Sequence, residues 1–155
     1  MKNRWLFLIV SLFLMTAARA QSDTYYNVGK DKLALEGYDA VSYFTEKKPQ
    51  KGEERWNYSY NGILYRFKNE VNKVTFRQNP EKYQPAYGGW CTYAMAKSGE
   101  KVPINPLAYK ISNGKLLLFY KKAFVNTLSV WNKSKISETE RLKKGDQYWA
   151  TIIKK

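Results

Sequence analysis

Two stretches of the chain alternate between apolar and polar residues, and an Asn-Gly pair interrupts each of them. The first stretch spans 56–67 around Asn61-Gly62, and the second spans 108–120 around Asn113-Gly114. Alternation with a period of two is typical of a strand with one buried face. Asn-Gly readily adopts the positive φ angles of a two-residue hairpin turn. The pattern therefore predicts two antiparallel β-hairpins.

Helical spacing of apolar residues predicts helices in much of the remaining sequence. The expected helices cover 70–79, 80–83, a turn beginning near 90, 122–131 and 137–153. Asn69 is a suitable N-cap for the first of them, with Val71, Val74 and Phe76 on its buried face. Trp149 is expected on the apolar face of the last helix.

A turn at Gly37 followed by a short strand near Ala40–Phe44 is expected before the first hairpin. Short antiparallel strands with helices packed against them define an α+β fold. The chain has 155 residues, of which 44% are hydrophobic, and this is enough for one domain with its own core. We therefore expect a small single α+β domain built on two β-hairpins with Asn-Gly turns.

The first twenty residues have the pattern of a signal peptide. Lys2 and Arg4 precede an apolar run over 5–15, and Ala18-Arg19-Ala20 resembles a cleavage site. The run is too short to span a bilayer, and no second one follows it. The expected organisation is a signal peptide at 1–20, an N-terminal arm at 21–32 and a domain at 33–155. This predicts an exported protein, periplasmic or secreted, without a transmembrane segment in the mature chain.

The chain is strongly basic, with a formal net charge of +14, and the expected signal peptide contributes only three of its positive charges. A positive charge of this size favours anionic partners. Export argues against nucleic acid as the partner. Scattered lysines are typical of a solvated surface, so the charge predicts weak association with an anionic surface.

One cysteine and no histidine limit the chemistry of the chain. A single cysteine permits no intramolecular disulfide, and in an oxidising compartment an unpaired thiol is exceptional. The absence of histidine excludes Ser-His-Asp and Cys-His nucleophile schemes and every histidine metal site. Most hydrolase functions are thereby excluded.

The single cysteine, Cys91, follows a Gly-Gly-Trp sequence at the expected start of a helix. Met95 would then lie one turn further along the same helical face. A thiolate and a thioether are soft ligands that suit copper(I), so Cys91 and Met95 are a candidate metal site. The alternative is that both side chains fill space in the core. As a redox site, Cys91 would require an external thiol to resolve its sulfenic acid.

Aromatic and small residues near this motif are candidates for the lining of a pocket. The residues are Tyr38, Asp39, Tyr87, Gly88, Gly89, Trp90 and Tyr93. Asp39 together with Glu36 can hold a hard cation or act in acid–base chemistry. The alternative role for Asp39 is to cap backbone N–H groups of a turn.

Several motifs together resemble those of the exported YHS-domain proteins, over roughly residues 33–150. The matching motifs are Gly37-Tyr38-Asp39, Tyr43-Phe44, Tyr60-Asn61-Gly62, Tyr65-Arg66-Phe67, Phe76, Asn79-Pro80, Tyr83, Pro85, Tyr87-Gly88-Gly89-Trp90-Cys91, Tyr93 and Asn113 through Tyr120. The resemblance implies a YHS-like α+β domain of a group described as metal-associated. Some similar exported members carry selenocysteine in the Gly-Gly-x-Cys motif, which favours a working chalcogen at Cys91.

From the residues and the resemblance together, we expect an exported YHS-type binding domain that handles a soft, copper-like metal through one thiol. Its expected partner is a metal- or thiol-exchanging envelope protein. Two alternatives remain open: a thiol-dependent redox accessory protein or enzyme, and a basic envelope-interaction module with an inert cysteine. Whether the chain is an enzyme stays open, and binding is favoured because the absence of histidine removes most hydrolase schemes.

Overall fold

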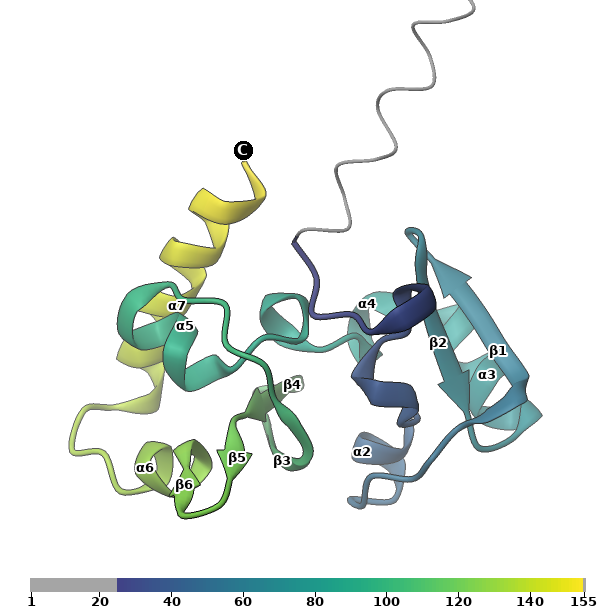
Figure 1. The fold of residues 1–155 in the computed structure, drawn as a ribbon, viewed down its shortest axis with the longest axis horizontal. Coiled ribbons are helices and arrows are strands. Elements are labelled where there is room, and N and C mark those ends of the chain that lie inside the picture. Colours follow the sequence, from purple (N-terminus) through teal and green to yellow (C-terminus); the bar gives the residue numbers. More distant parts are fainter. Residues whose placement is uncertain (1–24, 155) are drawn as a thin grey trace, which may run out of the picture.

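The computed structural model describes residues 25–154 as one small α+β domain (Figure 1). Its strands form three two-stranded antiparallel sheets, which confirms the expected fold class. The expected signal peptide, and residues 21–24 of the expected arm, lie outside the described residues.

The elements follow one another as short strands and short helices, and only the last helix is long. The strands are β1 (Glu53–Tyr60), β2 (Ile63–Phe67), β3 (Asn105–Ser112), β4 (Lys115–Phe119), β5 (Lys121–Lys122) and β6 (Val125–Asn126). The α-helices are α2 (Ser42–Thr45), α3 (Glu70–Gln78), α4 (Pro80–Tyr83), α5 (Thr92–Ser98), α6 (Thr127–Asn132) and α7 (Glu138–Ile153). Three 3₁₀ turns complete the list: η3 (Lys30–Lys32), η4 (Leu35–Gly37) and η5 (Ala86–Gly89).

Both Asn-Gly hairpins are present as the sequence predicts. Tyr60 pairs with Ile63 across the first turn, and Ser112 pairs with Lys115 across the second. Asn61 and Asn113 have φ angles of 50° and 48°, and the glycine after each is also positive. Two consecutive residues with positive φ form the turn whose twist matches that of the flanking strands.

Strand β4 lies between two hydrophobic clusters and has apolar side chains on both faces. Leu116 and Leu118 pack in the first cluster, whereas Leu117 and Phe119 pack in the second. Neighbouring side chains of a strand point to opposite faces, so four apolar residues in a row serve both clusters. Figure 1 shows β1, β2 and α3 on one side of the β3–β4 hairpin and α5, α6 and α7 on the other.

The expected strand near 40–44 is wrong, because this segment forms the short helix α2. The side chain of Asp39 accepts hydrogen bonds from the backbone N–H groups of Val41 (2.8 Å) and Ser42 (3.3 Å). A carboxylate that satisfies the first free N–H groups favours a helical turn over an extended strand. The apolar composition of the segment therefore reflects burial, which both kinds of element can produce.

Helix α3 begins as expected, since Asn69 accepts a hydrogen bond from the backbone N–H of Asn72 at 2.8 Å. Its buried face differs in part from the expectation. Phe76 is buried, but Val71 is 70% exposed. The inward position one turn before Phe76 belongs to Asn72, whose side-chain amide donates to Asp39 at 2.7 Å. A buried polar partner has thus replaced an apolar one.

The expected helix over 122–131 is correct only in its second half. Residues 121–126 form the β5–β6 hairpin, in which Lys122 pairs with Val125. Helix α6 starts after it, because Asn126 accepts hydrogen bonds from the N–H groups of Leu128 and Ser129. The N-cap thus separates the hairpin from the helix.

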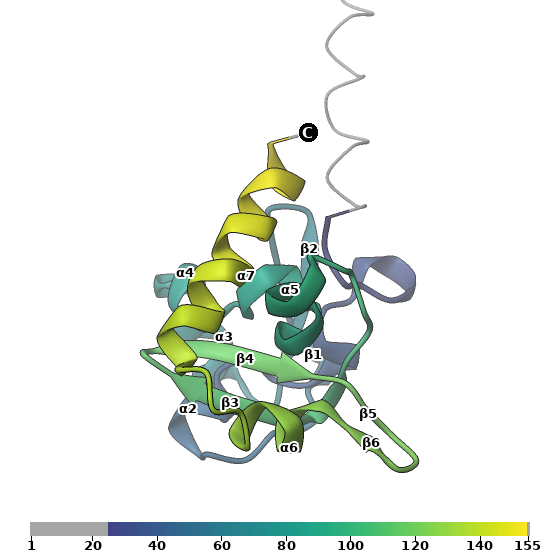
Figure 2. The ribbon, with the colours of Figure 1, turned by 90° about the vertical axis from the view of Figure 1, so that its left-hand side faces the viewer.

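The last helix is confirmed, with Ser137 as its N-cap and Trp149 packed against the second cluster. Helix α7 lies beside α5 in both views (Figures 1 and 2). No helix within residues 25–154 is both long and apolar enough to cross a membrane.

Candidate functional site

Cys91 is the N-cap residue of α5, which confirms that a helix starts directly after it. Its backbone N–H donates to the carbonyl of Val102 at 2.9 Å, and its carbonyl accepts from Met95 at 3.0 Å. These two bonds fix the backbone on both sides of the side chain. The side chain of Cys91 is fully buried.

Two groups from one short segment contact the sulfur of Cys91. The backbone N–H of Tyr120 donates to the sulfur at 3.4 Å, and Oγ1 of Thr127 lies 3.5 Å from it. The Thr127 hydroxyl donates its single hydrogen to the carbonyl of Tyr120 at 3.0 Å. The remaining contact is then a thiol S–H donating to Thr127. If the thiol ionises, rotation of the Thr127 hydroxyl supplies a second donor to the thiolate.

These residues form part of a recess of about 320 Å³ beside the cysteine, called here the thiol recess. It is lined by Cys91, Tyr93, Ala94, Lys97, Ser98, Glu100, Val102, Tyr120 and Thr127. Tyr120 and Thr127 stand at the two ends of the β5–β6 hairpin, so the base of this hairpin covers the sulfur. Local movement of this short hairpin would uncover the sulfur from the side of the recess.

Met95 is fully buried, and its side chain belongs to the second hydrophobic cluster with Leu117, Phe119 and Trp131. This position favours a packing role for the thioether. Within residues 25–154, no group of three or more cysteine, aspartate or glutamate side chains is placed to hold a metal ion. Cys91 supplies one donor, and a soft cation there needs at least a second one even in a linear geometry.

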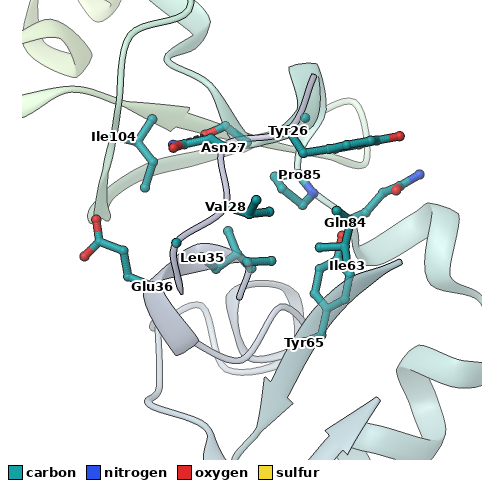
Figure 3. A pocket seen from close by; sticks show the side chains of 14 residues that line it. Tyr26, Asn27, Val28, Leu35, Glu36, Ile63, Tyr65, Gln84, Pro85 and Ile104 are labelled. Atoms are coloured by element: carbon teal, nitrogen blue, oxygen red, sulfur yellow. Dashed lines mark hydrogen bonds between the residues drawn. The ribbon is translucent and has the colours of Figure 1, made fainter. Parts of the chain in front are cut away.

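The two glycines before Trp90 border a different cavity, of about 160 Å³, between the N-terminal arm and the first cluster. The arm is held there by Asn27, which bonds to the carbonyls of Gly88 (2.8 Å) and Gly89 (3.0 Å). Figure 3 shows Val28 and Leu35 at its centre, with Ile104 and Tyr65 at either side. The cavity is small, its lining is mixed polar and apolar, and Cys91 is not among the residues that line it.

Gly88 has both a conformational and a steric reason to be glycine. Its φ angle is 59°, which side-chain-bearing residues rarely adopt. A Cβ atom here would lie 2.7 Å from the ring of Trp149. The Gly-Gly pair thus allows α7 and the N-terminal arm to approach the turn before Cys91.

The aromatic residues of the motif anchor the surrounding elements. The Tyr87 hydroxyl donates to Asp146 of α7 at 3.1 Å. Burial, the charge of Asp146 and this hydrogen bond all raise the pKa of Tyr87. The indole N–H of Trp90 donates to the carbonyl of Tyr25 at 2.6 Å. Among the motif's aromatic residues, Tyr93 is the one that lines the thiol recess.

Asp39 and Tyr38 belong to another part of the molecule. Besides its two bonds at the start of α2, Asp39 accepts from the backbone N–H of Lys68 (3.0 Å) and from Asn72. The ammonium of Lys51 lies 4.1 Å from the ring centre of Tyr38. With four donors on a fully buried carboxylate, Asp39 has the geometry of the capping role.

The structure thus brings Cys91 and Tyr93 together, but places Gly88 and Gly89, Asp39, and Met95 in separate surroundings. Sequence reasoning missed Tyr120 and Thr127, which contact the sulfur. The one local signal for them was the pair Lys121-Lys122. Two adjacent lysines fit a solvent-exposed turn as well as the start of a helix, and such a turn would have separated Tyr120 from Thr127.

Known proteins offer no match to this chain, whether the comparison is with family models, with curated sequences or with solved structures.

Proposed function

We propose that the chain is an exported, YHS-like binding domain that takes up a soft, thiophilic cation of the copper(I) type at Cys91. The cation is cargo that the domain receives from, and passes to, a thiol- or metal-exchanging partner. The motif around Gly88-Gly89-Trp90-Cys91 supports the family assignment, and the chemistry of sulfur supports the class of ligand.

The observation that carries this proposal is the position of the Cys91 sulfur beside a recess and beneath a short hairpin. A cysteine that only fills space is surrounded by apolar side chains. Here Tyr120 donates an N–H to the sulfur, and Thr127 presents a hydroxyl that can serve either protonation state. Both groups can stabilise the thiolate that a soft cation requires.

The presence of a single cysteine favours metal binding over redox turnover. A thiol oxidised to sulfenic acid is normally resolved by a second thiol, and the chain contains only one cysteine. A two-coordinate soft cation needs only one more donor, which a partner can supply during exchange. Lys97 and Glu100 at the thiol recess can contact such a partner.

Silver(I), a redox-inert analogue of copper(I), tests the proposal by native mass spectrometry and calorimetric titration. We expect the folded protein to bind a single ion, with a water or buffer ligand in the place of the partner's donor, and Cys91→Ser to abolish binding. Met95→Leu is the matched control because it preserves volume, and it should bind as the parent does. Binding that survives Cys91→Ser, or its absence from the parent protein, would refute the proposal. Peroxide-driven turnover with a thiol donor would indicate the redox alternative instead.

A further inference from the structure

Exposed large apolar side chains are concentrated in the segment over residues 121–136. Among the large apolar side chains exposed within residues 25–154, four of eight lie in this segment: Phe124, Val125, Val130 and Ile136. Phe124 is fully exposed, and the other three are about half exposed. Single exposed apolar residues are ordinary, but clustering of this kind indicates a surface that something covers.

Phe124 is exposed because of where it lies in the chain. It follows Ala123, whose φ of 50° makes the tight turn of the β5–β6 hairpin. Figure 2 shows this hairpin projecting from the body of the domain. Both views place the hairpin and α6 at the same end of the molecule (Figures 1 and 2). The apolar tip and the exposed residues of α6 therefore share one end.

The charges of this segment have a single sign. It contains Lys121, Lys122, Lys133 and Lys135, all exposed, and no aspartate or glutamate. Within the described residues, none of the four lysines forms an ion pair. Lysines without acidic neighbours complement a uniformly negative surface, and anionic lipid headgroups form such a surface.

A groove of about 570 Å³ beside α6 also combines apolar and cationic side chains. Val130, Trp131 and Ile136 form its apolar lining, with Lys97 and Arg141 also at its surface. The guanidinium of Arg141 stacks on the ring of Trp131 at 3.8 Å from its centre. An apolar floor with cations around it matches the boundary between acyl chains and anionic headgroups.

We propose that residues 121–136 form a docking surface for an anionic lipid bilayer, with Phe124 entering the headgroup region and the four lysines contacting the headgroups. An aromatic side chain has few rotatable bonds and therefore loses little conformational entropy on insertion. The attraction of each lysine to anionic headgroups adds to the affinity and is weakened by salt. This attachment is peripheral, and it does not depend on the function proposed for Cys91.

Vesicle co-sedimentation of the mature protein tests this surface. We expect binding to vesicles of phosphatidylcholine mixed with phosphatidylglycerol, weak binding to phosphatidylcholine alone, and release by salt. Phe124→Ala and the double variant Lys121→Glu/Lys122→Glu should each weaken binding by at least about five-fold. All three residues are exposed, so these variants should keep the melting temperature of the parent protein.

The control carries the same change of net charge elsewhere, as Lys30→Glu/Lys82→Glu on η3 and α4. If it weakens binding as much as the hairpin variant does, only net charge matters and the proposal is wrong. Phe124→Trp adds a depth probe, and brominated lipid should quench more of its fluorescence than that of the parent. No vesicle binding at low salt also overturns the proposal, and self-association that depends on Phe124 would then identify a protein interface.

Discussion

The sulfur of Cys91 lies 3.5 Å from the Oγ1 atom of Thr127, a residue 36 positions later in the chain. Thr127 begins α6 directly after the β5–β6 hairpin, and Tyr120 directly precedes that hairpin. The cysteine is therefore covered by the base of a hairpin with two-residue strands. We therefore expect access to the thiol to require local opening of this hairpin and not unfolding of the core.

Removal of the Thr127 side chain should expose the thiol. In Thr127→Ala, both the cover over the sulfur and the hydroxyl bond to the Tyr120 carbonyl are lost. One hydrogen bond contributes about 1 kcal/mol, so alkylation of native Cys91 should accelerate by about five-fold or more. Thr127→Ser keeps the hydroxyl and should react nearly as the parent does. Equal rates in all three proteins would show that Thr127 does not restrict access.

Glu138 should stabilise the protein in a pH-dependent manner. It accepts hydrogen bonds from Lys110 (2.5 Å), Ser112 and Trp131 (2.8 Å), which join β3, α6 and α7. Burial alone would raise its pKa, but these three donors and the charge of Lys110 lower it from 4.5 to about 2. Because the folded pKa is depressed, the stabilisation is present above about pH 4.5 and is lost as the pH falls towards 2.

The variant Glu138→Gln should therefore be less stable at pH 7 by about 1 kcal/mol, a value reduced for solvent screening of a partly exposed group. Urea unfolding at several pH values measures the difference. The two proteins should converge in stability as the pH approaches 2, provided both remain folded. A difference that stays constant with pH would contradict the assigned pKa.

Asp39 should be essential to stability rather than to ligand binding. Its buried carboxylate accepts from three backbone N–H groups and from Asn72. In Asp39→Asn, an NH₂ group would face one of these donors, at an expected cost of about 3 kcal/mol. Denaturant unfolding measures this cost, with Asp31→Asn on η3 as an exposed control. Silver binding by the folded fraction should be unchanged, and its loss would assign Asp39 to the site.

A substitution at Thr92 should raise the stability of the protein, whereas Asp39→Asn lowers it. Its side chain is fully buried, and its hydroxyl is without a hydrogen-bond partner in the part of the chain that the structure describes. Thr92→Val replaces that hydroxyl by a methyl group of similar size and should raise stability by about 1 kcal/mol. The melting temperature should rise accordingly. A fall would mean that the hydroxyl has a partner in solution.

The sequence predicts the parts of the fold whose causes are local. Both Asn-Gly hairpins, the Asn69 cap and the start of a helix at Cys91 depend on residues within a few positions of one another. The expected strand at 40–44 failed because Asp39 caps that turn while bonding to Asn72, 33 residues away. The hairpin at 121–126 failed as a prediction because its lysines and Phe124 fit a helical spacing equally well.

The candidate site likewise has one part that the sequence predicts and another that depends on residues distant in the chain. The motif identifies Cys91 from sequence alone, but Tyr120 and Thr127 lie 29 and 36 residues from it. Only the tertiary fold brings them to the sulfur. Met95 satisfied the helical spacing of a ligand, yet the same spacing turns its side chain towards Phe119 and Trp131 in the core.

Whether the thiol is reachable in the folded protein can be measured by alkylation of native Cys91 across low urea concentrations, with and without one equivalent of silver(I). We expect modification of folded protein with little dependence on urea, because only the hairpin must open, and protection by silver. Modification with the urea dependence of global unfolding, unaffected by silver, would contradict this expectation and leave Cys91 a packing residue.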